Sequence, residues 1–140
     1  MAYLENQLEV KQSTIPGAGE GLFTKEPIKK NSIIVEYKGT VTSWKAVEHE
    51  ADNVYIYYIN RNHVIDASRH NRTFGRYAND ASGMKKLKGF RNNTKYVKEK
   101  GKVFLQAIAD IPAGAEILVS YGKEYWDVIK NNHRLEMKRK

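Results

Sequence analysis

The sequence contains no cysteine among its 140 residues. This absence excludes disulfide bonds, zinc clusters with cysteine ligands and thiol catalysis, and it fits a reducing compartment. The first ten residues hold Glu5 and Glu9 and no long apolar run, so they match neither a signal peptide nor a membrane span. We therefore expect no disulfides and no membrane association.

Metal and hydrolase chemistry also lack support in the sequence. The histidines are far apart and show no paired spacing that would suit a metal ion: His49, His63, His70 and His133. Serine, histidine and aspartate all occur, but no nucleophile-elbow motif accompanies them. We therefore predict no metal site and no hydrolase triad.

The net charge of +8 comes from 24 Lys and Arg against 16 Asp and Glu residues. Such a balance favours acidic partners, among them nucleic acid and chromatin. A soluble protein with a lysine-rich surface would show the same balance. Part of the excess lies in the tail from Arg134 to Lys140. Charge therefore does not decide the function.

The chain has the size and composition of a single globular domain. Hydrophobic residues make up 41% and charged residues 29%, and neither a repeat nor a linker divides the sequence. Alternating β-branched and aromatic residues predict short strands at 8–11, 33–37, 54–59, 64–67, 95–98, 103–109 and 117–119. Helical spacing predicts helices at 43–51, where Ser43 can cap, and at 123–131.

These elements indicate a mainly β, β-rich α+β fold with irregular connections. We divide the chain into an N-terminal strand or extension at 1–12, a main domain at 13–122, and a C-terminal helix with a basic tail at 123–140.

Two local patterns each allow an ordinary structural interpretation and a functional one. Glycines alternate with other residues at 17–21, which marks backbone with positive φ or close approach to a ligand. The spacing does not fit a dinucleotide fingerprint, so this segment taken alone favours a tight turn over a cofactor loop.

In the tyrosine run, Tyr55 and Tyr57 share one strand face, opposite Ile56 and Tyr58. Sheet packing is the commoner interpretation of such a run, and an apolar channel with hydroxyls at its end is the alternative.

Taken in order, five segments resemble the sequence blocks of SET-domain protein lysine methyltransferases. They are residues 13–23, 34–39, 64–67, 76–80 and 109–122. No single block is distinctive, but their order and spacing carry the resemblance, which extends from residue 13 to residue 127.

The resemblance implies a SET fold of small curled sheets, a C-terminal pseudoknot and a short terminal helix. It also implies S-adenosylmethionine as the cofactor, entering opposite the substrate. Carried over by position, the residues that would hold the cofactor are Ala18, Gly19, Glu20, Tyr55, Asn79, Asp80 and Trp126. Tyr121 would be the catalytic tyrosine, and Tyr57, Val119 and Tyr121 would line the channel for the substrate lysine.

The chemistry of lysine agrees with this assignment. A lysine amine has an ordinary pKa of about 10.4, so it must lose a proton before it can attack a methyl group. Burial in an aromatic channel beside a sulfonium charge lowers that pKa. A tyrosine hydroxyl can then orient the amine, and neither a metal nor a separate acid is needed.

Three features depart from the family pattern. Asp80 stands where the family usually has histidine, and its effect depends on whether the position acts through its backbone or its side chain. Val119 stands where an aromatic is common, and the smaller side chain would leave room for di- or trimethylation. The cysteine-rich zinc segment is missing, so Trp126 would either cover the cofactor or pack its helix onto the core.

The favoured hypothesis is methylation of lysine side chains on a protein, with histones as one candidate substrate. A non-catalytic SET-fold binding module for a lysine-containing protein is the alternative, and a basic nucleic-acid-binding protein is a third. The sequence is most like the minimal stand-alone SET proteins of large viruses and some bacteria. That likeness implies an intracellular setting, either cytoplasmic or at host chromatin in the nucleus. It also implies a monomer or homodimer with no direct need for nucleic acid.

Overall fold

The computed structural model describes residues 3–49, 55–69, 73–81 and 91–121. The strands in this part of the chain are β1 (Leu8–Gln12), β2 (Glu20–Thr24), β3 (Ile33–Glu36), β4 (Thr40–Thr42), β5 (Ile56–Asn60), β6 (His63–Asp66), β7 (Thr94–Glu99), β8 (Lys102–Ala107) and β9 (Glu116–Ile117). One α-helix, α1 (Trp44–Val47), and two 3-10 turns, η1 (Glu5–Gln7) and η2 (Gly75–Tyr77), accompany them.

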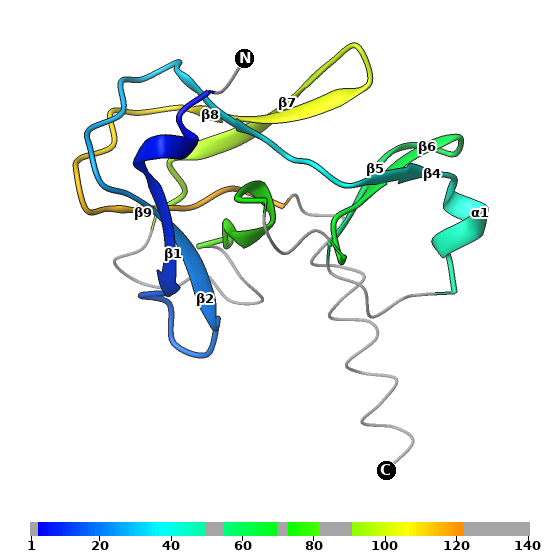
Figure 1. Ribbon diagram of the computed structural model, residues 1–140, viewed down its shortest axis with the longest axis horizontal. Coiled ribbons are helices and arrows are strands. Elements are labelled where there is room, and N and C mark those ends of the chain that lie inside the picture. The colour runs from blue at the N-terminus through cyan, green and yellow to red at the C-terminus, as the bar shows by residue number, and fades with distance from the viewer. Residues whose placement is uncertain (1–2, 50–54, 70–72, 82–90, 122–140) are drawn as a thin grey trace.

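The strands form three small sheets in which every pairing is antiparallel, with the orders β1-β2-β9, β3-β8-β7 and β4-β6-β5. In Figure 1 the first two sheets lie on one side of the molecule, and the third sheet with α1 lies on the other. The mainly β class predicted from the alternating sequence pattern is confirmed. No helix among the described residues is long and apolar enough to cross a membrane.

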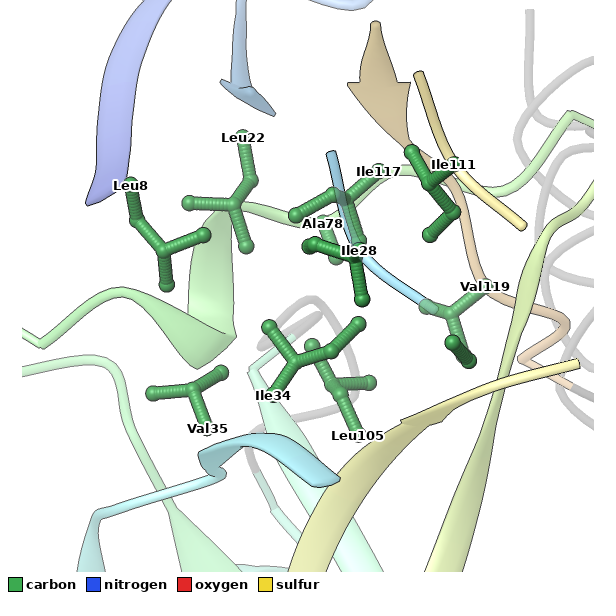
Figure 2. Packing of buried hydrophobic residues seen from close by; sticks show 11 residues of the cluster. Leu8, Leu22, Ile28, Ile34, Val35, Ala78, Leu105, Ile111, Ile117 and Val119 are labelled. Atoms are coloured by element: carbon green, nitrogen blue, oxygen red, sulfur yellow. The ribbon is translucent and has the colours of Figure 1, made fainter. Parts of the chain in front are cut away.

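The main core is formed by side chains from the first two sheets and from adjoining segments. Figure 2 shows its side chains converging from segments that are far apart in the sequence. Its buried members are Leu8, Leu22, Ile28, Ile34, Val35, Ala78, Leu105, Ala107, Ile111, Ile117 and Val119. Strand β2 is the central strand of its sheet, between β1 and β9, and its residues after Glu20 are buried, with Leu22 in the main core. This core holds the start and the end of the described chain together.

The third sheet confirms the predicted alternation of its tyrosines. Tyr57 lies opposite Ile65 and packs into a second core cluster, as does Tyr55. Tyr58 points to the other face, where it is 50% exposed and its ring contacts Trp44 with centroids 5.6 Å apart. The period of two therefore separates a buried face from an exposed one.

The predicted hairpin and first helix are found, the helix in a shorter form. Strands β7 and β8 pair from Glu99 opposite Lys102, as the sequence predicts. Ser43 caps α1, since its Oγ accepts a hydrogen bond from the Ala46 backbone N–H at 3.3 Å. The last two residues of the predicted helix at 43–51 lie outside the described residues, as does the helix predicted at 123–131.

The final described segment is inserted between two earlier parts of the chain. After β9, Leu118 forms a parallel bridge with Asn79, and Val119 forms a parallel bridge with Thr94. The Val119 N–H donates to the Asn79 carbonyl at 2.8 Å. This insertion positions Tyr121 against the middle of the chain, and it agrees with the threaded arrangement expected for the C-terminal part.

Candidate functional site

Tyr121 is attached to residues 78–80 at both its side chain and its backbone. Its hydroxyl donates a hydrogen bond to the Ala78 carbonyl at 2.6 Å, and its backbone N–H donates to Asp80 Oδ2 at 2.9 Å. The ring packs against the main core while staying partly exposed. Because the hydroxyl proton is directed at Ala78, the oxygen can act only as an acceptor toward any further partner.

The carboxylate of Asp80 is engaged inside the protein. The residue is 6% exposed, and its Oδ1 accepts a hydrogen bond from Asn92 Nδ2 at 3.0 Å. Asn92 Oδ1 in turn accepts from the Ala81 backbone N–H at 2.8 Å. The side chain of Asp80 is therefore used in contacts within the protein.

Asn79 and Glu20, both predicted cofactor residues, are brought together. Asn79 Nδ2 donates to the Glu20 carbonyl at 2.9 Å, and it also lies 3.5 Å from Glu116 Oε2. The 79–80 segment is thus joined to the start of β2, where the glycine-rich segment ends.

Glu116 binds the residues that precede the glycine-rich segment. It is 7% exposed and accepts hydrogen bonds from Ser13 Oγ at 2.6 Å, Thr14 Oγ1 at 2.6 Å and the Thr14 N–H at 2.9 Å. Gly21 lets this carboxylate approach, because a Cβ there would stand 2.4 Å from Glu116 Oε2. Glu116 was included in the closing family block and was given no role from the sequence. A lone carboxylate beside an apolar strand could have indicated it, because a buried charge needs hydrogen-bond partners.

The segment between Thr14 and Glu20 is held in shape by packing. Ile15 and Ala18 pack with Ala81 and Leu118 in a small third cluster. Gly17 and Gly19 adopt φ values of +76° and +73°, and no atom of the described residues lies within 4 Å of the place where a Cβ would stand at either position. Among the described residues, these two glycines therefore leave space on their Cβ side, and Asn79 contacts the following Glu20.

Tyr55 is stacked on Arg76. The guanidinium carbon of Arg76 lies 4.0 Å from the Tyr55 ring centroid and 5.1 Å from the Tyr77 ring centroid. Arg76 Nη1 donates to the carbonyls of Ala67 and Ser68, each at 3.0 Å. Arg76 Nε is buried and has no hydrogen-bond acceptor among the described residues. The sequence included Arg76 in a family block but did not identify it as a site residue.

Three tyrosines form an aromatic cluster next to Tyr121. The ring centroids of Tyr57 and Tyr96 are 4.9 Å apart, those of Tyr37 and Tyr96 are 6.0 Å apart, and those of Tyr37 and Tyr57 are 6.1 Å apart. Burial raises the pKa of Tyr57. Burial raises the pKa of Tyr96 well above its ordinary value, and repulsion from the other tyrosines, including Tyr121, and from Asp80 adds to the effect. We call Tyr37, Tyr57 and Tyr96 the tyrosine cluster, and the raised pKa values keep the hydroxyls of Tyr57 and Tyr96 neutral at physiological pH.

The sequence identified Tyr57 in this cluster and missed Tyr37 and Tyr96. Both lie in or directly after predicted strands, and nothing local marks either as different from an ordinary sheet tyrosine. Their proximity to Tyr57 follows only from the placement of β5, in one sheet, against β3 and β7, which flank β8 in another.

The structure does not test the roles predicted for Val119 and Trp126. Val119 is 0% exposed and belongs to the main core, so its place in a lysine channel stays a prediction. Trp126 lies outside the described residues. Within the described ranges, no group of three or more histidine, aspartate and glutamate side chains could hold a metal ion.

Comparison with known proteins agrees with this geometry. The SET domain family model matches residues 19–122. The chain is 28% identical over 119 residues to N-lysine methyltransferase KMT5A-A of Danio rerio, a match that covers 77% of this chain and 33% of that protein. The chain thus spans about a third of the length of this curated relative.

A solved structure shows the same fold. The methyltransferase domain of human PR domain-containing protein 2 superposes with a TM-score of 0.60 at 23% identity, covering 83% of this chain and 77% of that one. The family model, which matches well over half of the sequence, and this structural likeness lead to one conclusion: the chain belongs to the SET-domain family.

Proposed function

We propose that this protein transfers methyl groups from S-adenosylmethionine to lysine side chains of another protein, with Tyr121 as the catalytic residue. The observation that carries the proposal is the environment of Tyr121 in a SET-domain chain. Its hydroxyl donates to the Ala78 carbonyl, and it adjoins the tyrosine cluster. The similarity to a protein named as an N-lysine methyltransferase supports lysine as the acceptor.

The described residues fit the cofactor at two points. Within the described part of the chain, Gly17 and Gly19 leave space on their Cβ side, and Asn79 donates to the carbonyl of the following Glu20. Arg76 Nε is a buried donor with no acceptor among the described residues, and a carboxylate such as that of S-adenosylmethionine would supply one. When bound, S-adenosylmethionine supplies a methyl group whose S–C bond breaks as the N–C bond to lysine forms, leaving a neutral thioether.

The tyrosine cluster would prepare the lysine amine. The raised pKa values of Tyr57 and Tyr96 keep these hydroxyls uncharged, so they present no phenolate charge that would hold an ammonium ion. Burial of the amine among such rings disfavours its charged form. The ammonium proton leaves for solvent before attack, and the nitrogen lone pair becomes free.

Tyr121 would orient that amine. Its hydroxyl proton is directed at the Ala78 carbonyl, so toward a substrate the oxygen acts as an acceptor. An amine N–H donating to this oxygen leaves the nitrogen lone pair directed elsewhere, toward the methyl group. Fixing the hydroxyl in advance lowers the entropic cost of reaching the reactive geometry.

The proposal extends to histones as one substrate class, and to a minimal, intracellular protein that acts as a monomer or homodimer. These parts rest on the family resemblance. The net charge of +8 disfavours a basic peptide, so we expect acidic residues near α1, such as Glu48, to help bind a histone tail.

The proposal is tested with methyl-labelled S-adenosylmethionine and a panel of purified histones and other lysine-rich proteins. We expect label on lysine, located by mass spectrometry, with di- or trimethyl products where Val119 leaves room. Cofactor binding by calorimetry without label on any protein would favour the non-catalytic binding module. The absence of both cofactor binding and label would refute the proposal.

A further inference from the structure

A chain of hydrogen bonds connects the backbone of Tyr121 to Asp80, Asn92 and Ala81. We infer that Asp80 and Asn92 act together as a clamp that positions Tyr121, and that this pair replaces the histidine usual in the family. The Tyr121 N–H donates to Asp80 Oδ2 at 2.9 Å, and Asn92 Nδ2 donates to Asp80 Oδ1 at 3.0 Å. The inference rests on the proposed function only in taking Tyr121 as catalytic.

The direction of every bond in the clamp is fixed from its backbone ends. The Ala81 N–H can only donate, so the Asn92 side chain must turn its oxygen toward Ala81, at 2.8 Å. Its NH₂ group therefore faces Asp80 and needs an acceptor there. The Tyr121 N–H, a second fixed donor, needs another acceptor on the same side chain.

Position 80 must therefore present two acceptors, and an ionised carboxylate does so. A neutral histidine offers one acceptor and one donor, so one ring nitrogen would set a hydrogen against Asn92 or Tyr121. Asp80 thus suits a chain that has Asn92 at the other end of the clamp. The departure from the family pattern at position 80 is matched by the residue at position 92.

The clamp bears on the position of the Tyr121 hydroxyl. Residues 78–80 hold Tyr121 at its hydroxyl through Ala78 and at its backbone through Asp80. Releasing the backbone end would let the ring shift against the Ala78 carbonyl. Such a shift affects methyl transfer more than cofactor binding, because small misplacements of a reacting group cost rate.

A swap of the two side chains tests the clamp. D80N places an NH₂ group against a donor, so we expect kcat to fall about tenfold or more, while the Kd for S-adenosylmethionine changes less than about threefold. In the double variant D80N/N92D the amide at position 80 accepts from Tyr121 and donates to the carboxylate at position 92. That carboxylate still accepts from Ala81, so we expect kcat to return to within about threefold of wild type.

A matched control and a second readout make the test specific. D110N changes an exposed aspartate that also accepts a backbone hydrogen bond, from the Lys30 N–H at 2.9 Å, and it should leave kcat unchanged. Hydrogen exchange of the Tyr121 amide reports on the clamp without any substrate. We expect its protection to fall about tenfold in D80N and to recover in D80N/N92D.

The outcomes distinguish a failure of the proposed function from a failure of the clamp. A wild-type protein without activity would remove the proposed function, while the exchange data would still decide the clamp. An active D80N with unchanged protection, or a double variant no better than the single one, would overturn the clamp. If D80N does not fold, a folded double variant with wild-type protection supports the clamp, and a double variant that also fails to fold overturns it.

Discussion

Glu116→Gln is the perturbation that most directly tests how the proposed cofactor loop is held. The carboxylate is buried and receives hydrogen bonds from Ser13 and Thr14 at 2.6–2.9 Å, and Asn79 Nδ2 lies 3.5 Å away. The amide keeps one acceptor, which must face the Thr14 N–H because that group cannot reverse. Its NH₂ group is then directed at Ser13 Oγ and at the NH₂ group of Asn79.

The magnitude follows from the loss of charge assistance. A hydrogen bond to a charged group stabilises by about 1.5–3 kcal/mol and a neutral one by about 0.5–1.5 kcal/mol, so each of two or three bonds loses about 1 kcal/mol. The neutral amide is less costly to bury, which offsets part of this loss. We expect the free energy of unfolding to fall by about 2 kcal/mol, which lowers Tm by about 6 °C for a domain of this size.

The assay is urea unfolding followed by circular dichroism, with calorimetric titration of S-adenosylmethionine. Binding should weaken, because Ser13, which donates to this carboxylate, also donates its backbone N–H to the Gly19 carbonyl at 2.8 Å. Glu9→Gln is the control, since Glu9 forms an exposed ion pair with Lys11 at 3.5 Å and should change stability by less than about 0.5 kcal/mol. A Glu116→Gln variant as stable as the control, with unchanged cofactor affinity, would refute the reasoning.

Three further outcomes are expected. Gly21→Ala places a Cβ 2.4 Å from Glu116 Oε2 and should lower unfolding free energy by about 1–3 kcal/mol, and an unchanged urea midpoint would contradict this. Burial raises the pKa of Tyr96 above 10.0, so the folded state holds that proton more tightly than the unfolded state. Stability should therefore fall as pH rises above about 10, and the fall should be smaller in Tyr96→Phe when unfolding is measured from pH 8 to 11. Arg76→Lys keeps the charge but loses the stack on Tyr55 and the paired bonds to two carbonyls, so calorimetry should show weaker cofactor binding, and wild-type affinity would count against a cofactor role.

The local elements could be predicted from the sequence because their signals are local. The β7–β8 hairpin, the cap at Ser43 and the alternation at Tyr57 and Tyr58 each depend on neighbouring residues. The family blocks marked both Tyr121 and residues 76–80, and the structure adds that the Tyr121 hydroxyl donates to the Ala78 carbonyl.

The connections within the site depend on residues too far apart for local patterns. Glu116 contacts Ser13 and Thr14 across more than one hundred residues, and the tyrosine cluster draws on different sheets. Asn92 lies outside every strand and helix predicted from the sequence, yet its side chain connects the Asp80 carboxylate to the Ala81 N–H. Donor and acceptor direction decides such contacts, and a sequence pattern of polarity does not encode it.

The central claim, that Tyr121 carries out the positioning step of lysine methylation, is tested most directly by Tyr121→Phe. The control is Tyr58→Phe, which removes a hydroxyl from a half-exposed tyrosine on the far face of the third sheet. Both variants are assayed with labelled S-adenosylmethionine and the best substrate of the panel. We predict that Tyr121→Phe loses about a hundredfold or more in kcat while Tyr58→Phe keeps wild-type activity. Equal labelling by wild type and Tyr121→Phe would contradict the account.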